Sequence, residues 1–258
     1  MDDKAIVIGG GVGPMAGVAL HALIIENTLT DGKDQGHFDV QHFSRSADIP
    51  DRTAFLTGSD ARNPAEGMAR TFRCAWAALS ACGKQGVGAV PCNTFHAPAI
   101  FDPFLRILER EGIRIPVLHL LDETMRFIDE AYPGLRRIGV LSTSGTRKTG
   151  IYRDLLAANG RELVELPEER QADLQDAIYN PEWGAKAVCP VSARSRELMA
   201  ELTGLLAACG AEAVILGCTE LPLGLPGKSL NGILLINPVL ALARALVREA
   251  DPCKLKAL

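Results

Sequence analysis

Two cysteines stand in settings where a thiol could act as an acid or a base. Cys92 lies in VPCNTFHAP, where small and apolar residues give way to Asn93, Thr94 and His96. Cys218 lies in VILGCTELPL, again after an apolar run and before a threonine. Buried cysteine is usually inert, but polar donors or a helix N-terminus beside a thiol favour the reactive thiolate. The two settings together predict a pair of active thiols.

Two thiols permit chemistry that one thiol does not. A single thiolate could attack a carbonyl carbon as a nucleophile. Two thiols on opposite sides of a substrate suit inversion of a carbon centre, because one removes a proton and the other returns a proton to the opposite face. The α-proton of an amino acid is a very weak acid, so its carboxylate must be held by donors and water excluded. The pair favours racemization over decarboxylation, which would need only one thiol.

Short apolar runs ending in Gly, Ser or Pro alternate along the chain with longer amphipathic stretches. Helical patterns cover residues 64–82 and 193–209, and another helix is expected to begin at Pro238, after Asn237. Strands alternating with helices predict an α/β fold with mainly parallel sheets. The apolar runs are typical of strands buried on both faces, and they cover residues 5–10, 88–92, 115–120, 138–143, 213–218 and 233–237.

A weak internal duplication relates the two halves of the chain. KAIVIGGGVGP resembles RIGVLSTSGT, GVGAVPCNTFHAP resembles AEAVILGCTELPL, and IPVLHLLDETMRFIDEA resembles ILLINPVLALARALV. The order of these segments is the same in both halves. Their spacing is similar, since 84 residues separate Ile8 from Cys92 and 77 separate Leu141 from Cys218. Each half is therefore expected to contribute one cysteine from the carboxyl end of a strand.

The duplication predicts two similar, pseudo-symmetric three-layer domains. We expect an N-terminal domain over residues 1–116, completed by residues 229–258, and a C-terminal domain over residues 117–228. Open α/β sheets bind ligands just outside the carboxyl ends of their strands. If the domains face each other, both thiols face one cleft, which is where we expect the active site.

Composition and charge are those of a globular protein that binds neither nucleic acid nor membranes. The chain has 258 residues, of which 47% are hydrophobic and 22% charged, as in ordinary globular proteins. Its net charge of −4 argues against a nucleic-acid or membrane-surface partner. MDDKAIVIGG lacks the basic start of a signal peptide, and no apolar run has membrane-spanning length. Seven cysteines without CxxC pairs predict reduced cytoplasmic thiols and no metal site.

The chain resembles the aspartate/glutamate racemase family, and most closely its aspartate racemases. The resemblance is carried by IGGGVGP at 8–14, IPDRT at 49–53, PCNTFHA at 91–97, STSGTRKTGIY at 142–152 and GAEAVILGCTE at 210–220. It implies a cofactor-independent racemase, without pyridoxal phosphate, that acts on a dicarboxylic amino acid and forms a homodimer. It also implies that the two cysteines, here Cys92 and Cys218, are the acid/base catalysts.

The same motifs contain candidate ligands for the substrate. Arg52, in IPDRT, is the expected fork for a side-chain carboxylate and the reason to prefer a dicarboxylic substrate. The small-residue turn at 143–146 is of the kind that holds anions. The full set of expected substrate-binding residues is Gly11, Arg52, Asn93, Thr94, Thr143, Ser144, Gly145, Thr146 and Thr219, with His96, Arg194 and Glu220 as further candidates.

This chain departs from the family pattern at several places. Phe95 stands where the family usually has Ala, and Val12 stands where Met is common. Some aspartate racemases have a substrate-binding lysine that we expected near Ala193. The local sequence there is CPVSARSRE, which leaves Arg194 as the stand-in. These departures bear on the substrate more than on the reaction type.

Other functions stay open on the sequence alone. The substrate could be glutamate, another amino acid or a hydantoin, and the fold could serve a non-catalytic amino-acid-binding protein. Gly11, Gly13 and Ala16 also satisfy the GxGxxA form of a dinucleotide fingerprint. Pro14 removes a backbone donor from that loop, and no acidic residue ends FDVQHFS, the next apparent strand. An NAD-linked oxidoreductase is thus the weakest alternative.

Overall fold

The computed structural model describes residues 4–258 and divides the chain into two compact units. The first unit holds residues up to Glu123 together with Val239–Leu258, and the second is Thr124–Pro238. The first three residues, with which the predicted N-terminal domain begins, lie outside the described part. The sequence pattern predicts that the chain returns to the first unit at residue 229. Pairing of strands β9 and β7 instead keeps the chain in the second unit through Pro238.

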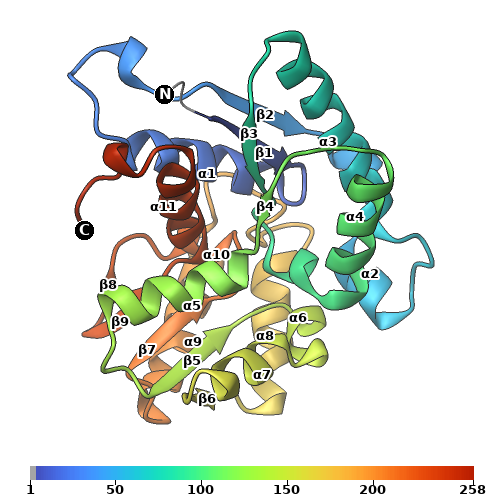
Figure 1. Ribbon diagram of the computed structural model, residues 1–258. Helices are drawn as coiled ribbons and strands as arrows, with labels where there is room; N and C mark the ends of the chain where they lie inside the picture. The colour runs from blue at the N-terminus through green and yellow to red at the C-terminus, as the bar shows by residue number, and fades with distance from the viewer. Residues whose placement is uncertain (1–3) are drawn as a thin grey trace. The chain divides into compact units, whose positions relative to one another are not determined.

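The first unit contains a four-stranded parallel sheet in the order β2-β1-β3-β4 (Figure 1). Strands β1 and β3 are buried along their whole length, as the continuous apolar runs predicted. Ile8 of β1 is paired with Ala89 of β3, so the two strands end side by side. The strands are β1 (Ala5–Gly10), β2 (Val40–Ser44), β3 (Gly86–Ala89) and β4 (Val117–Leu118).

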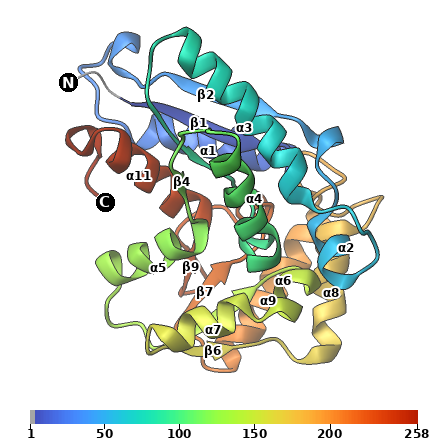
Figure 2. The ribbon, with the colours of Figure 1, turned by 45° about the vertical axis from the view of Figure 1, so that its right-hand side comes forward.

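Helices cover both faces of this first sheet. Figure 2 shows α3 in front of the sheet and α1 behind it. Helix α3 starts where predicted because Asn63 accepts a hydrogen bond from the Ala65 N–H and Pro64 occupies the first turn. The helices of this unit are α1 (Pro14–Asn27), α2 (Arg52–Thr57), α3 (Pro64–Ala81), α4 (Pro98–Arg110) and most of α11 (Pro238–Ala250), with short 3₁₀ turns η1 (Asp34–Gly36), η2 (Ser46–Asp48), η3 (Asn93–His96) and η4 (Pro252–Lys254).

The second unit repeats this plan with one added strand. Its sheet has the order β6-β5-β7-β9-β8, and only β8 is antiparallel to its neighbour. The strands are β5 (Arg137–Leu141), β6 (Glu162–Val164), β7 (Ala213–Leu216), β8 (Ser229–Leu230) and β9 (Ile233–Ile236). The helices are α6 (Ser144–Thr149), α7 (Ile151–Ala158), α8 (Glu168–Tyr179), α9 (Ala193–Ala208) and α10 (Leu221–Gly224), and α5 (Leu120–Ala131) crosses from the first unit into the second.

The shared strand order confirms the predicted fold class and internal duplication. The order β2-β1-β3-β4 corresponds strand by strand to β6-β5-β7-β9. In both units the central strand pair carries a cysteine just beyond its second member, β3 or β7. A cleft formed by the two units together stays a prediction.

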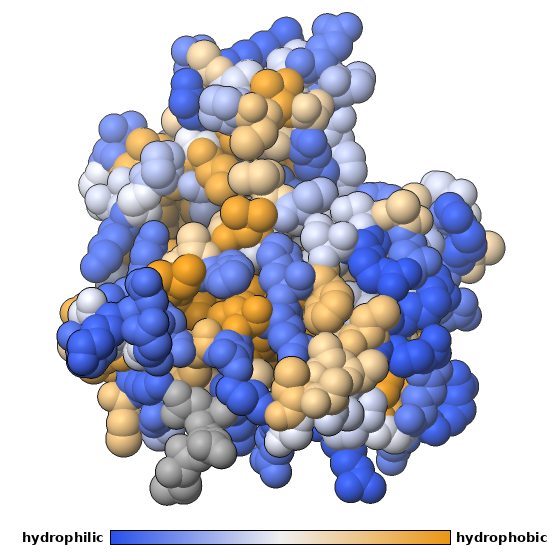
Figure 3. All heavy atoms as spheres, turned by 90° about the horizontal axis from the view of Figure 1, so that it is seen from above, coloured by the Kyte–Doolittle hydropathy of each residue, from blue (hydrophilic) through white to orange (hydrophobic). Residues whose placement is uncertain are grey.

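Each unit has its own apolar core. In the first, Phe72 of α3 packs edge-on against Phe104 of α4 at a ring distance of 5.1 Å, beside Val7 of β1. In the second, Leu202 and Leu206 of α9 pack in a cluster that also contains Leu216 of β7. Figure 3 shows one outer face, where orange apolar side chains gather between blue polar ones. Within residues 4–258, no helix combines the length and the apolar character needed to span a bilayer.

Candidate active site

Cys92 lies three residues beyond the end of β3, in a tight turn that leads into α4. Its N–H donates to the Val90 carbonyl at 2.9 Å, and its own carbonyl accepts the Phe95 N–H at 3.1 Å. Only 6% of the residue is exposed. The turn thus fixes the backbone on both sides of the thiol.

Cys218 occupies the matching place in the second unit, two residues beyond β7. The preceding Gly217 donates its N–H to the Ile215 carbonyl at 3.0 Å, and the Cys218 carbonyl accepts the Leu221 N–H at 3.0 Å. Exposure is again 6%. In each unit, therefore, an almost buried cysteine follows a central strand and is held by a similar turn.

The residues after Cys92 divide into polar and packing positions. Asn93 and Thr94 are buried, with 2% and 6% exposure, directly beside the thiol residue. Phe95, the departure from the family pattern, is fully buried and packs edge-on against Phe104 at 5.4 Å. Phe95 therefore fills the core of the first unit and is not a substrate ligand.

His96 supports the backbone of Cys92 and not its thiol. Its Nδ1 donates to the Cys92 carbonyl oxygen at 2.9 Å, which fixes the neutral tautomer. Burial, assisted by the nearby His119, lowers the pKa of His96 to about 3. The ring packs against Phe101 at 4.8 Å. His96 is therefore a neutral positioning side chain at physiological pH.

Cys218 belongs to a short chain of polar side chains. Its Sγ donates to Glu220 Oε2 at 3.0 Å, and Lys186 Nζ donates to Glu220 Oε1 at 2.6 Å. The Glu220 side chain is 4% exposed and that of Lys186 is 22% exposed. The Thr219 hydroxyl also donates to Glu220 Oε2, at 3.4 Å. A nearly buried carboxylate thus links the thiol to an ammonium group.

The charges in this cluster set which groups hold protons. Burial raises the pKa of the Cys218 thiol, and the Glu220 carboxylate raises it further against the opposing effect of Lys186. Burial alone would lower the pKa of Lys186, but Glu220 and Cys218 outweigh it and raise that pKa. Burial, with a smaller effect of Cys218, also raises the pKa of Tyr152. The resting cluster therefore contains a thiol, a carboxylate and an ammonium.

Arg52 begins helix α2 and lies almost buried, with 8% exposure. Asp51 is the N-cap of that helix, and its carboxylate accepts the Ala54 N–H at 2.8 Å. Arg52 Nη1 donates to the Pro50 carbonyl at 3.3 Å. Asp51 thus caps the helix, and Arg52 is a cation held in a defined position on the first unit.

The segment before Arg52 is packed tightly against helix α3 at Gly67. A Cβ atom at this position would overlap the Asp48 carbonyl oxygen and come within 3.1 Å of the Ile49 Cα. Gly67→Ala is expected to lower the free energy of unfolding by roughly 1–3 kcal/mol, because backbone must move to admit the methyl group. Urea denaturation would measure this loss.

The matched control for that substitution is Gly204, which lies in helix α9 with open space around it. Gly204→Ala should stabilise the protein by about 0.5–1 kcal/mol, since alanine is the better helix former. Equal responses of the two variants would show that the close approach at Gly67 does not constrain the segment.

Gly11 allows another close approach in the first unit. Its φ of +86° is in the region that favours glycine. A Cβ atom here would come within 2.7 Å of the backbone nitrogens of Arg45 and Ser46. The loop after β1 therefore packs directly on the backbone that follows β2. The close approach explains why glycine stands at position 11.

The turn at 143–146 follows β5 and opens helix α6. Thr143 is the N-cap, and its Oγ1 accepts the Thr146 N–H at 3.3 Å. The Ser144 N–H donates to Gln175 Oε1 at 2.9 Å. Gly145 is buried between them. Two of the backbone donors that we expected for an anion are thus used within the unit, so the threonine hydroxyls are the better candidates for substrate contacts.

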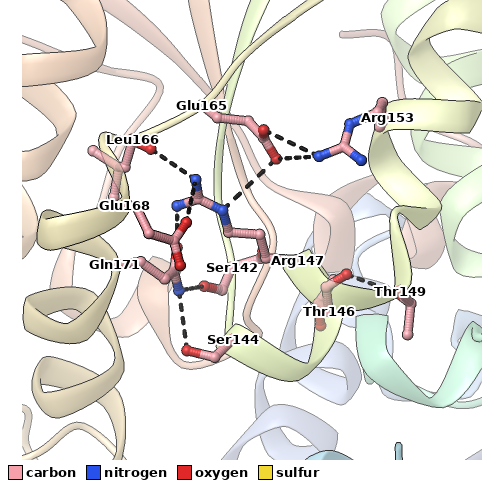
Figure 4. Close-up of polar contacts among 10 residues, drawn as sticks. All are labelled: Ser142, Ser144, Thr146, Arg147, Thr149, Arg153, Glu165, Leu166, Glu168 and Gln171. Carbon is pink, nitrogen blue, oxygen red and sulfur yellow. Dashed lines mark hydrogen bonds and ion pairs between the residues drawn. The ribbon is translucent and has the colours of Figure 1, made fainter. Parts of the chain in front are cut away.

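Figure 4 shows that Gln171 of α8 forms hydrogen bonds with this turn and that Arg147 contacts Gln171. Gln171 Nε2 donates to the Ser142 carbonyl at 3.0 Å and to Ser144 Oγ at 3.4 Å. Gln171 Oε1 in turn accepts from Arg147 Nη1 at 3.1 Å. Arg147 also donates to the Leu166 carbonyl at 2.9 Å. Gln171 could not be predicted from the sequence, because it lies 27 positions after Ser144 and in no recognisable motif. Arg147 lies inside the motif at 142–152, but no role was predicted for it.

Lys186 is the other functional candidate that sequence reasoning missed. We expected a lysine near Ala193 and named Arg194 as its stand-in. Arg194 is exposed and stacks over the Trp183 ring at 4.2 Å. Lys186, seven positions before Ala193, instead makes the ion pair with Glu220. The GAK sequence around it carries no signal that would have identified it.

Comparison with known proteins places these features in a family. The sequence pattern of the Asp/Glu/hydantoin racemase family matches residues 10–246. An aspartate racemase of Picrophilus torridus is similar in structure, with a TM-score of 0.78, 23% identity and coverage of 99% of this chain and 96% of that one. A glutamate racemase of Francisella tularensis, solved with D-glutamate, has a TM-score of 0.60 at 18% identity over 100% and 86% of the two chains.

A curated relative matches part of the chain at higher identity. The broad specificity amino-acid racemase RacX of Bacillus subtilis is 31% identical over 102 residues, which are 38% of this chain and 40% of RacX. The family match, by contrast, extends over most of the chain and includes both cysteines and the polar residues around them. The chain therefore belongs to the Asp/Glu/hydantoin racemase family, whose members are isomerases.

Proposed function

We propose that this protein is a cofactor-independent aspartate racemase in which Cys92 and Cys218 are the two bases. The observation that carries the proposal is the repeated setting of the two thiols. Each follows a central parallel strand, each is held by a similar backbone turn, and each is 6% exposed. Cysteines with only a packing role would have no reason to occupy the same position and turn in both units.

Racemization requires one thiolate to take the α-proton while the other thiol delivers a proton to the opposite face. The carbanion formed in between is costly, so its carboxylate must be held by donors that are already in place. Asn93 and Thr94 can supply such donors beside Cys92, and Thr143, Thr146 and Thr219 can do so in the second unit. Near-complete burial of these residues supports the role, because hydrogen bonds to a carboxylate are stronger away from water.

Glu220 gives Cys218 a route for its proton. In the resting protein the thiol donates to Glu220 Oε2, so Cys218 starts as the acid. When Cys218 must act as the base, its proton passes to the Glu220 carboxylate before the thiolate takes the α-proton. Lys186 balances the charge of Glu220 at 2.6 Å and keeps that carboxylate ionised in a nearly buried place.

Arg52 supports a dicarboxylic substrate. Its guanidinium is almost buried at the start of α2 and can bind a carboxylate through two parallel hydrogen bonds. We assign it to the side-chain carboxylate of aspartate. The two similar solved structures support a dicarboxylic substrate, since one is an aspartate racemase and the other a glutamate racemase.

A racemase of broader specificity is the second candidate. This candidate is favoured by the similarity to RacX, a broad specificity amino-acid racemase, which extends over 102 residues. Glutamate, a neutral amino acid or a hydantoin would then be substrates as well. The role of Arg52 separates the two candidates, because a protein that accepts neutral amino acids has no need of that cation.

Exchange in heavy water tests the proposed function. Purified protein without added cofactor should replace the α-proton of L-aspartate by deuterium, which proton NMR measures. It should also convert L- to D-aspartate, which chiral chromatography measures. L-Alanine in parallel should react at least about 100-fold more slowly, because it lacks the side-chain carboxylate that we assign to Arg52. L-Glutamate should react roughly 10- to 100-fold more slowly, because its carboxylate is one methylene group further from the α-carbon. Exchange of all three at similar rates would favour the broad-specificity candidate. Binding of aspartate without exchange would leave only an amino-acid-binding protein.

A further inference from the structure

Two glutamines of helix α8 form hydrogen bonds with Ser144, the first residue of α6. Gln171 and Gln175 are four positions apart, so they lie one turn apart on the same face of α8. Gln175 Oε1 accepts the Ser144 N–H at 2.9 Å, and Gln171 Nε2 donates to Ser144 Oγ at 3.4 Å. One helix therefore binds both the backbone and the hydroxyl group of Ser144.

The orientation of the Gln171 amide group follows from its neighbours (Figure 4). A guanidinium group has only donors, so the Gln171 atom that faces Arg147 Nη1 at 3.1 Å is the amide oxygen. The amide nitrogen then faces the Ser142 carbonyl, which only accepts, at 3.0 Å. Gln171 and Ser142 are buried, so a reversed amide would leave buried polar groups without partners. Arg147 thus fixes Gln171 as a donor to the turn.

A donor at this place determines how the Ser144 hydroxyl group can act. Because Ser144 Oγ accepts a hydrogen bond from Gln171, the hydroxyl hydrogen is directed away from Gln171. The Ser144 N–H is already used by Gln175. The hydroxyl hydrogen is therefore what Ser144 can offer to an acceptor outside α8. Ser144 is only partly buried, so a small ligand can reach it.

We propose that Gln171 is a positioning residue that directs the Ser144 hydroxyl group to donate to a carboxylate of the substrate. This role rests on the proposed function, because it requires a carboxylate-bearing substrate at the turn that follows β5. A donor that is oriented before the substrate binds strengthens binding, since little freedom of the side chain is then lost on contact. Gln171 acts through Ser144 and does not touch the substrate, and Arg147 holds Gln171 in the required orientation.

Binding of succinate to the full chain, measured by isothermal titration calorimetry, tests the role of Gln171 without turnover. Succinate has the two carboxylates of aspartate but no reactive centre. Ser144→Ala should weaken its binding at least about 10-fold, as expected for loss of a hydrogen bond to a charged group. Gln171→Glu should do the same, because a carboxylate there accepts the Ser144 hydroxyl hydrogen and turns it away from the ligand. Asp173→Asn, which removes a pair with Arg170 within α8, is the matched control and should bind as the parent does.

The double variant Ser144→Ala with Gln171→Glu separates positioning from charge repulsion. If Gln171 acts through the hydroxyl group, its replacement should have less than about a twofold further effect once that group is absent. A further loss of about 10-fold would mean that the new carboxylate repels the ligand directly, and it would overturn the proposal. So would parental affinity in Ser144→Ala. Gln171→Met removes the donor without adding charge and should weaken binding about threefold or more, because the hydroxyl group is then free to rotate.

Kinetics with aspartate separate this role from the proposed function. Gln171→Glu should raise KM about 10-fold or more and lower kcat less than about threefold, because the hydroxyl group binds the carboxylate already in the ground state. A general distortion of the second unit would instead lower kcat and the free energy of unfolding together. An unchanged KM in active Gln171→Glu would overturn the positioning role while the proposed function stands. A parent that binds succinate as expected, with the predicted responses of the variants, but does not racemize aspartate would contradict only the proposed function.

Discussion

Replacement of either Cys92 or Cys218 by serine is expected to lower kcat for aspartate racemization at least about 10³-fold, with little change in KM. A serine hydroxyl has nearly the size of a thiol but is a far weaker acid, so proton transfer fails while the binding residues stay in place. Cys82→Ser and Cys209→Ser, at exposed cysteines elsewhere in the chain, are the controls and should retain parental kcat.

The two cysteine variants should also differ from each other. A variant with one thiol left can still take and return a proton on one face of the α-carbon. In heavy water, Cys218→Ser should therefore exchange the α-proton of one enantiomer only, and Cys92→Ser that of the other. Exchange of the same enantiomer by both variants, or parental kcat in either, would exclude the assignment of these thiols as the two bases.

Glu220→Gln is expected to lower kcat about 100-fold and also to destabilise the protein. The glutamine keeps the shape but no longer accepts the Cys218 proton, and general acid–base groups contribute effects of this size. The change also leaves Lys186 without its counter-charge. Loss of one partner from a buried pair costs roughly 3–5 kcal/mol, and partial exposure of Lys186 places the cost at or below the lower end.

The double variant Glu220→Gln with Lys186→Met separates these two effects. Removing the ammonium should restore much of the stability seen in urea denaturation, whereas kcat should stay low because the proton acceptor is still missing. Recovery of parental kcat in the double variant would show that Glu220 matters only as a counter-charge. Glu212→Gln is the control, because Glu212 accepts from the Arg136 and Arg137 N–H groups on the same unit and stands before the start of β7, at the opposite end of that strand from Cys218.

A pH measurement distinguishes a chemical role of Glu220 from a structural one. The carboxylate raises the pKa of the Cys218 thiol, so its removal should lower that pKa and make the thiol reactive at lower pH. Alkylation of the Cys218 peptide by iodoacetamide, followed against pH by mass spectrometry, would measure this shift. Loss of activity together with a more acidic thiol is the signature of a lost proton acceptor. An unchanged alkylation profile would argue against contact between the two groups in solution.

The sequence by itself predicted the central buried strands, the helices α3, α9 and α11, the internal duplication and the position of each cysteine after a strand; it did not predict strands β6 and β8. These features are local, because burial on two faces, helix caps and tight turns each depend on a few neighbouring residues. Residues 5–10 and 213–216 form strands as expected, and α3 begins at Pro64 next to its Asn63 cap. The motif around each cysteine could likewise be identified, because its residues are consecutive.

Only the tertiary structure decided which distant side chains meet. Lys186 reaches Glu220 across 34 positions, and Gln171 reaches Ser142 across 29. Neither Lys186 nor Gln171 could be identified as a functional candidate from the sequence. Pairing of β9 with β7, which keeps residues 229–238 in the second unit, is also a contact between segments far apart in the chain. Such contacts depend on how helices pack over a sheet, and no local pattern of residue types encodes that packing.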